Sequence, residues 1–287
     1  MTKRLLITLA AGLAFCLPAA FGQDLLVVES ENLRCNDSVL VFSPLREGER
    51  ERDIPTLFLL HGWSGCFRDW SRNTDLQGLS NEYGFRIICP DGFYDSWYID
   101  KVDSTGMKWR TFFWEELWPL IDNEYGLEPD RTFIDGLSMG GHGAMNIFLD
   151  HPELFRGAGS MSGVLDLRHS GGSKFLIPPM LGATDIEDPL CEAQSAVNRL
   201  ERVKEACGED ALPGGGKLLV VSCGTLDKTF LPASEEFAAR CRELSLDCIL
   251  LLSPARHRWQ YWVWVLPHHL DWFRESLTDP DMGFTDK

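Results

Sequence analysis

Residues 136–140 read Gly-Leu-Ser-Met-Gly, a spacing in which a serine can act as a nucleophile. In the pattern G-x-S-x-G the serine sits at a sharp strand-to-helix turn, and the flanking glycines let that turn close without side-chain clashes. An apolar stretch at 131–135 precedes the motif, and a stretch typical of a helix follows it at 141–149. The context favours a nucleophilic Ser138 over a serine in an ordinary glycine-rich turn. The helix N-terminus beneath it would stabilise a developing negative charge.

A serine nucleophile needs a general base and a carboxylate that orients the base. In chains with this elbow, the acid and then the base follow the serine along the sequence. Asp227 comes shortly after an apolar strand at 218–222, where active-site loops gather, and is predicted as the acid. Asp166, shortly after the preceding strand, is the second choice. His257 lies in a loop downstream of Asp227 and is predicted as the base.

The other histidines fit the role of base less well. His142 is within the helix that follows the elbow, too close in sequence to swing onto the serine. His151 and His169 precede the predicted acid, and His268 and His269 fall within the predicted final helix. His61 ends an apolar strand and is predicted to fix its loop.

An acyl-transfer reaction also needs donors for the oxyanion. The strand at 57–60 ends in His61-Gly62-Trp63-Ser64-Gly65. We predict that the backbone N–H groups of Trp63 and Met139 form the oxyanion hole. The histidines show no ligand spacing with cysteines or carboxylates, and the serine mechanism needs no Lewis acid, so neither metal nor cofactor is predicted.

Short apolar runs alternate with helical patterns along the chain, which predicts an α/β fold with a mostly parallel sheet and helices on both faces. The predicted strands are 38–42, 56–60, 85–89, 131–135, 157–161, 218–222 and 248–252. The predicted helices are 109–125, 139–150, 193–206, 232–244 and 268–277. Residues 168–216 are predicted as a short cap-like insertion, with one helix, within a single domain at 23–287.

The N-terminus predicts export. Lys3 and Arg4 precede an apolar run that ends near Gly22, which is typical of a signal peptide over residues 1–22. The mature protein is therefore expected to be secreted or periplasmic, without stable membrane insertion. Lipid anchoring at Cys16 is disfavoured by the bulky Phe15 before it. The net charge of −16 argues against nucleic acid as a partner.

Export makes disulfides chemically accessible to the cysteines of the mature chain. Cys89 and Cys223 lie in or beside apolar strands and are expected to be buried thiols. The better disulfide candidates flank helices in more polar stretches; they are Cys191, Cys207, Cys241 and Cys248. The sequence does not determine their connectivity or the oligomeric state.

Four segments together resemble one family, the esterase D and tributyrin esterase group of α/β-hydrolases. That group also contains feruloyl esterases, S-formylglutathione hydrolases and mycolyltransferases. The segments are Leu-His-Gly at 60–62, Gly-Leu-Ser-Met-Gly-Gly-His-Gly-Ala at 136–144, Cys-Gly-Thr-Leu-Asp at 223–227 and His-Arg-Trp-Gln-Tyr-Trp at 257–262. Two positions depart from the pattern: Ala255-Arg256 stands where glycines often precede the histidine, and Trp63 stands where a small or aliphatic residue is usual.

The resemblance and the export signal together imply a secreted serine carboxylesterase for short-chain or aryl esters of the acetyl or feruloyl type, with plant polysaccharide as one source of substrate. Trp97, Tyr98 or Trp109 could then stack on a sugar or aryl ring if exposed, although Trp109 fits a helical core stripe better. An acyltransferase of the same fold and an S-formylglutathione hydrolase-like thioesterase are the alternatives. A non-catalytic carbohydrate-binding module is disfavoured by the complete set of serine, histidine and aspartate.

Overall fold

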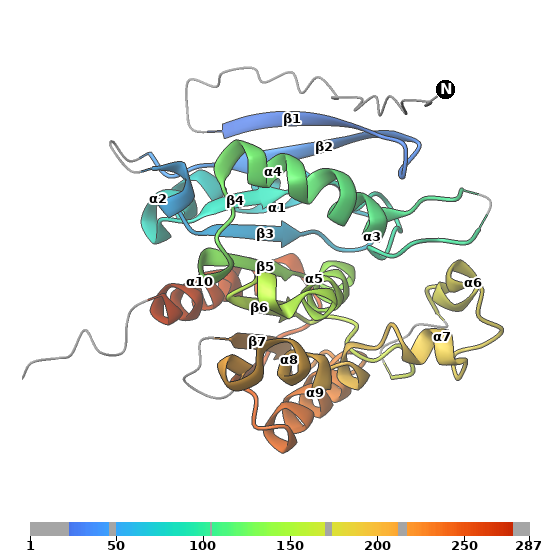
Figure 1. Ribbon diagram of the computed structural model, residues 1–287. Coiled ribbons are helices and arrows are strands. Elements are labelled where there is room, and N and C mark those ends of the chain that lie inside the picture. Colours follow the sequence, from blue (N-terminus) through green and yellow to red (C-terminus); the bar gives the residue numbers. More distant parts are fainter. Residues whose placement is uncertain (1–22, 46–49, 104, 170–173, 212–216, 278–287) are drawn as a thin grey trace, which may run out of the picture.

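The computed structural model describes residues 23–45, 50–103, 105–169, 174–211 and 217–277, which are organised around an eight-stranded sheet (Figure 1). The strand order is β1-β2-β4-β3-β5-β6-β7-β8. β2 is antiparallel to both β1 and β4. The remaining strands, β3 to β8, are mutually parallel. The predicted α/β fold with a mostly parallel sheet is confirmed. The bounds are β1 Gln23–Ser30, β2 Cys35–Phe42, β3 Thr56–Leu60, β4 Arg86–Cys89, β5 Thr132–Gly136, β6 Gly157–Met161, β7 Leu218–Gly224 and β8 Cys248–Ser253.

Helices cover both faces of the sheet. All five side chains of β3 are buried; Phe58 and Leu60 join one apolar cluster, and the alternate residues Leu57 and Leu59 join the other. This two-sided burial explains why the central strands are apolar at successive positions. The first cluster is completed by α3 Trp109–Phe112, α4 Trp118–Tyr125, α5 Met139–Asp150, α8 Glu201–Cys207 and α9 Leu231–Glu243. The second is completed by α1 Asp69–Asn73, α2 Leu76–Tyr83 and α10 Trp259–Ser276.

The sequence and the structure differ most at the last helix. The sequence predicts a helix at 268–277 with Pro267 in its first turn, whereas α10 begins at Trp259 and holds Pro267 inside it. Proline removes one backbone hydrogen bond from a helix. The buried stripe that includes Tyr261, Val265 and Phe273 continues through the proline and outweighs that loss.

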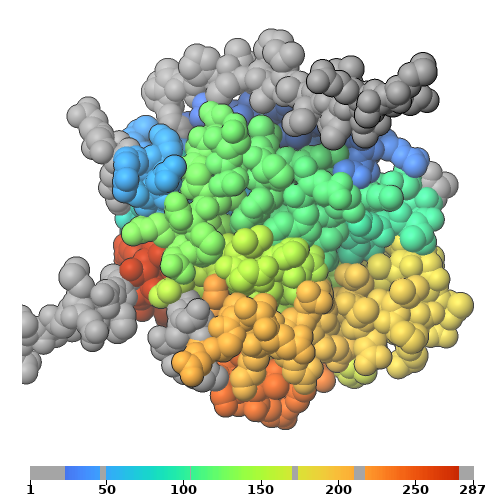
Figure 2. All heavy atoms as spheres, in the orientation of Figure 1, coloured from blue at the N-terminus to red at the C-terminus, as the bar shows by residue number. Residues whose placement is uncertain are grey.

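The connection between β6 and β7 is a long excursion, coloured yellow to orange at the lower right of Figure 2. It contains α6 Ile177–Leu181, α7 Pro189–Glu192 and α8, so the expectation of one helix at 193–206 is wrong. The helix is interrupted because Ser195 has an extended backbone, and its hydroxyl accepts a hydrogen bond from the Leu167 N–H at 3.0 Å. A bond from the Val102 N–H to the Met180 carbonyl, at 2.9 Å, fastens the excursion to the neighbouring loop.

Three predictions concern the chain ends and the cysteines. The predicted signal peptide, Cys16 included, lies outside the described residues. Among the residues that are described, no helix is long and apolar enough to cross a membrane.

Cys89 and Cys223 are buried as expected, and burial raises the pKa of Cys223 to about 11. No disulfide joins the described cysteines, although the neighbouring Cys248 thiol raises the pKa of Cys241.

Candidate active site

Ser138 occupies a strained turn between β5 and α5. Its backbone angles are φ 54° and ψ −115°, in a region that non-glycine residues rarely adopt. The Ser138 N–H donates to the carbonyl of Met161 at 2.9 Å, and this bond helps to hold the turn. A Cβ at Gly136 would lie 2.5 Å from the backbone of Gly140, and one at Gly140 would lie 2.4 Å from the carbonyl oxygen of Leu60. Both glycines of the motif are therefore required by close backbone contacts.

His257 lies between the predicted nucleophile and the predicted acid. Its Nε2 is 2.9 Å from the Ser138 Oγ, and its Nδ1 is 2.7 Å from the Asp227 Oδ2. Since an ionised carboxylate only accepts hydrogen bonds, Nδ1–H donates to Asp227, and Nε2 of the neutral ring accepts from the serine hydroxyl. The ring stacks on Phe230 with centroids 4.3 Å apart and meets the edge of Trp262 at 4.8 Å. The imidazole is thereby fixed in the orientation a general base needs.

Backbone pairing explains why the acid and the base meet. β7 and β8 are parallel neighbours, and their pairing continues past the strand ends through two more hydrogen bonds. The Thr225 N–H donates to the Ser253 carbonyl at 2.7 Å, and the Leu226 N–H donates to the Ala255 carbonyl at 3.0 Å. The two loops therefore leave the same edge of the sheet side by side.

Asp166 lies apart from this arrangement. Its carboxylate accepts hydrogen bonds from the Nη2 of Arg168 at 2.7 Å and from the Nε of Arg168 at 3.1 Å. No hydrogen bond joins it to His257 among the described residues. The geometry favours Asp227 as the orienting carboxylate.

The two predicted oxyanion donors remain available. Within the part of the chain that the structure describes, the N–H groups of Trp63 and Met139 donate to no acceptor. A Cβ on Gly62 would lie 2.5 Å from the Leu137 side chain and 3.6 Å from the Ser138 Cβ, so the Trp63 loop packs directly against the elbow. Both amides are therefore near the serine and unsatisfied by protein groups, which is the condition for an oxyanion hole.

Two other histidines hold the surrounding loops. The Nδ1–H of His61 donates to the Gly62 carbonyl at 2.8 Å, and its Nε2 accepts from the Gly92 N–H at 2.7 Å. His142 is fully buried, and its Nδ1–H donates to the Val164 carbonyl at 3.0 Å. Burial lowers the pKa of His142 to about 3, so this ring is neutral near pH 7. Neither ring is hydrogen-bonded to the Ser138 hydroxyl.

Ser138 and His257 open into a cleft of about 720 Å³. Four aromatic side chains form much of its wall: Trp63, Phe175, Trp259 and Trp262. Phe175 comes from the excursion between β6 and β7 and lies 5.7 Å from Trp63, centroid to centroid. The predicted insertion thus reaches the site. Phe175, Trp259 and Trp262 were not predicted to line the cleft; for the two tryptophans the density of aromatic residues just after His257 was the available signal.

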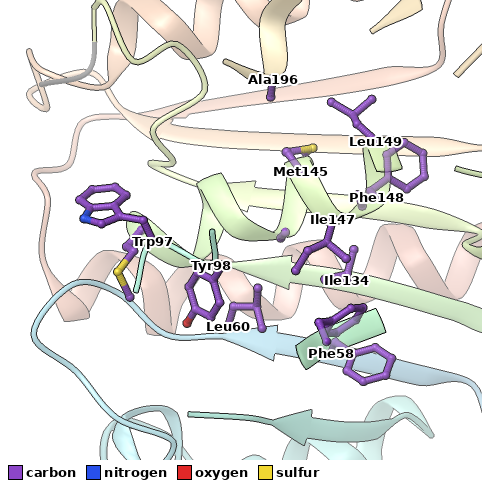
Figure 3. Close-up of a cluster of buried hydrophobic side chains, with 14 of the residues drawn as sticks. Phe58, Leu60, Trp97, Tyr98, Ile134, Met145, Ile147, Phe148, Leu149 and Ala196 are labelled. Atoms are coloured by element: carbon purple, nitrogen blue, oxygen red, sulfur yellow. The ribbon is translucent and has the colours of Figure 1, made fainter. Parts of the chain in front are cut away.

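Trp97 does not line the cleft as an exposed platform. Its side chain is fully buried, as is that of Tyr98, so the prediction that Trp97 stacks on substrate as an exposed ring is wrong; Trp109 is also fully buried, and its expected place in the core is confirmed. Figure 3 shows Trp97 and Tyr98 within a buried apolar cluster. Both residues have a positive φ, which non-glycine residues rarely adopt. Trp97 instead supports Phe175, with ring centroids 5.1 Å apart.

One group of side chains among the described residues has the spacing of a metal site: Asp166, His169 and Glu236. Two of the three residues are exposed, and the guanidinium of Arg168 already occupies both carboxylate oxygens of Asp166. A cation there would have to displace or adjoin that positive charge. None of the three residues lines the cleft that holds Ser138 and His257.

Comparison with known proteins is consistent with this architecture. The chain resembles a ferulic acid esterase (TM-score 0.70, 21% identity, 90% of this chain and 100% of that one). It also resembles an S-formylglutathione hydrolase from Agrobacterium tumefaciens (TM-score 0.75, 21% identity, 92% and 99%). At these identities the structures establish the fold, which is that of the α/β-hydrolases.

Sequence comparison establishes the family. The sequence model described as "Putative esterase" matches residues 30–273, so the chain belongs to this esterase family. A diacylglycerol acyltransferase/mycolyltransferase, Ag85A of Mycobacterium leprae, is 31% identical over 42% of this chain. An acetyl esterase of Caldicellulosiruptor saccharolyticus is 27% identical over 50% of it. The matches cover 40% of the mycolyltransferase and 56% of the acetyl esterase.

Proposed function

We propose that this protein is a secreted serine carboxylesterase that hydrolyses short-chain or aryl esters through an acyl-enzyme. The observation that carries the proposal is the hydrogen-bonded series Ser138–His257–Asp227 at the base of an open aromatic cleft. Family membership supports ester chemistry, and the N-terminal sequence pattern supports export.

Each group has a role that follows from its position. His257 removes the proton from the Ser138 hydroxyl as its oxygen attacks the ester carbonyl. The amides of Trp63 and Met139 bind the oxyanion, while Asp227 keeps the imidazole in the correct tautomer and stabilises its charged form. His257 then protonates the departing alcohol, and a water molecule repeats the sequence on the acyl-enzyme. No step requires a metal or a cofactor.

The cleft supports the choice of substrate. Its volume of about 720 Å³ is within the range of small-molecule sites, and its aromatic walls suit a compact acyl group or an aryl ring. A feruloyl or acetyl group attached to plant polysaccharide would meet both conditions, because the cleft opens at the surface.

Two measurements test the proposal together. A fluorophosphonate should label the protein once, at Ser138, as read by peptide mass spectrometry. A substrate panel of p-nitrophenyl esters of rising chain length, methyl ferulate and acetylated xylan should show turnover by the wild type, which Ser138→Ala abolishes while the melting temperature is kept. Full turnover by the Ser138→Ala variant would refute the mechanism.

Acyl transfer is the second candidate, because the similar mycobacterial proteins are described as acyltransferases. Transfer differs from hydrolysis only in the nucleophile that attacks the acyl-enzyme. Adding acceptor alcohols or sugars to a p-nitrophenyl ester reaction separates the two. An acyltransferase would yield mostly acylated acceptor, whereas the esterase proposed here should yield mostly free acid.

Export is tested separately from chemistry. When the full chain is expressed with its N-terminal segment, the extracellular or periplasmic product should begin near Gln23. A product that stays in the cytoplasm with residues 1–22 intact would contradict export without affecting the esterase proposal.

A further inference from the structure

A second cavity, of about 820 Å³, adjoins the Ser138 cleft and takes no part in the chemistry described above. It is a surface groove between the Asp227 loop, the end of β8 and the first turns of α10. Leu226, Leu252 and Trp264 line it and are respectively 45%, 37% and 49% exposed. They are three of only nine large apolar side chains exposed among the described residues, so their convergence on one groove marks a surface suited to an apolar ligand.

The groove shares part of its wall with the cleft. Arg258 and Gln260 line both cavities. His257 lies next to Arg258 in the same loop, so the Ser138 nucleophile and the groove are separated only by that loop. A substrate with its ester at Ser138 and an extension past Gln260 would reach the groove.

The charge of this region is opposite to that of the chain. The protein has 43 acidic and 27 basic residues, yet within the described residues no aspartate or glutamate lines either cavity. Arg256 and Arg258 are exposed and form no ion pair with any described carboxylate. Two uncompensated guanidiniums in an acidic protein make this groove attractive to an anion.

We propose that the groove binds the part of the ester substrate remote from the scissile bond, and that this part is apolar or aromatic and carries an anionic group. Leu226, Leu252 and Trp264 would contact its apolar portion, and Arg256 and Arg258 would bind its charge. The inference rests on the proposed esterase function and specifies the substrate of the same site.

The test compares esters that differ only in charge at the remote end. On the acyl side the pair is p-nitrophenyl 4-(4-carboxyphenyl)butyrate and its carboxamide analogue. On the alcohol side it is 3-(4-carboxyphenyl)propyl acetate and its carboxamide analogue. In at least one pair, kcat/KM should be about three- to tenfold higher for the carboxylate, and the preference should decline with added NaCl.

Variants assign the preference to the groove. Arg256→Gln and Arg258→Gln should each move the carboxylate-to-carboxamide ratio of kcat/KM toward one. Arg242→Gln, which removes an exposed arginine on α9, should leave the ratio unchanged. Trp264→Ala should raise KM for both members of the preferred pair.

The outcomes separate this inference from the function on which it rests. If none of the esters, p-nitrophenyl acetate included, is hydrolysed, both proposals fail. If the esters are hydrolysed but neither pair shows a preference for the carboxylate, the esterase stands and the groove proposal is overturned. A dimer in sedimentation that Trp264→Glu dissociates, again with no carboxylate preference, would assign the groove to contact between copies of the chain.

Discussion

At the scale of single residues, a carboxylate can orient a histidine only if no stronger partner holds it. Asp227 contacts His257 at 2.7 Å, whereas the Asp166 carboxylate is held by Arg168. Arg168 offers that carboxylate two N–H groups, an arrangement stronger than a single neutral hydrogen bond. The two aspartates should therefore respond very differently to the same substitution.

Asp227→Asn should lower kcat on p-nitrophenyl butyrate by up to about 10⁴-fold, because an amide at this position favours the wrong imidazole tautomer. Asp166→Asn should change kcat by only a few-fold, since it disturbs a neighbouring loop. Circular dichroism and the melting temperature of each variant serve as the control for folding. The opposite ranking of the two variants would transfer the role of acid to Asp166.

The spacing of Asp166, His169 and Glu236 gives a second prediction at this scale. Activity should be unchanged after incubation with EDTA and dialysis, because the proposed serine mechanism has no step that uses a Lewis acid. Turnover of p-nitrophenyl acetate before and after dialysis measures this. Loss of activity that one added divalent ion restores would contradict it, and His169→Ala would then show whether this group holds the ion.

Sequence order was sufficient to select the three side chains that the structure brings together. The reason is physical: parallel strands end at one edge of the sheet, so residues just after β5, β7 and β8 must be neighbours. The burial of Trp97 was not accessible in this way. It depends on a positive-φ turn and on Phe175, which is distant in sequence, and neither leaves a local pattern.

At the scale of elements, a partly buried ion cluster joins the elbow helix to the excursion between β6 and β7. Asp150, at the end of α5, accepts hydrogen bonds from Arg110 of α3 at 2.7 Å and from Arg199 of the excursion at 2.6 Å. Although burial opposes its ionisation, the two guanidiniums lower the pKa of Asp150 to about 2. The cluster therefore stabilises the attachment of the segment that carries Phe175.

Asp150→Asn should lower the free energy of unfolding by about 2 to 3 kcal/mol at pH 7. The folded-state pKa is below the unfolded value of about 3.9, so this contribution is present above pH ~4 and is lost as the pH falls toward 2. Urea unfolding at pH 7 and pH 3 should thus show a smaller difference from wild type at pH 3. Asp271→Asn, which breaks an exposed pair with Arg274, is the control and should cost under about 1 kcal/mol. An equal loss at both pH values for Asp150→Asn would show that its charge is not the cause.

Elements buried on both sides were the most predictable from sequence. The ranges for β3, β6 and α5 match the structure, because continuous apolar runs and the elbow mark them directly. β1 was not predicted; it directly follows the expected signal peptide, and its half-exposed, antiparallel pairing with β2 gives a weaker pattern. Pro267 was interpreted as the start of a helix because local propensity does not reflect the tertiary contacts that stabilise α10 on both sides of the proline.

At the scale of the whole molecule, the excursion between β6 and β7 does not resemble the lid of an enzyme working on lipid droplets. A lipase meets its interface with a sizeable exposed apolar area. In the described part of the excursion over the cleft, only Leu176 and Leu190 are large apolar side chains with high exposure. The nearby acidic residues include Asp185, Glu187 and Asp188, and the net charge of −16 opposes anionic lipid surfaces.

We therefore predict a preference for short or aryl acyl groups over long fatty chains. A palmitoyl chain would extend well beyond the aromatic walls of the cleft, and if it entered the adjoining groove its neutral end would leave Arg256 and Arg258 without an anionic partner. The kcat/KM for p-nitrophenyl acetate and for p-nitrophenyl butyrate should exceed that for p-nitrophenyl palmitate by at least about tenfold. Measurements with and without an emulsified interface complete the test, since an esterase of this kind should show no increase when droplets form. Faster palmitate hydrolysis, or a jump in rate at the appearance of droplets, would identify a lipase and overturn the prediction.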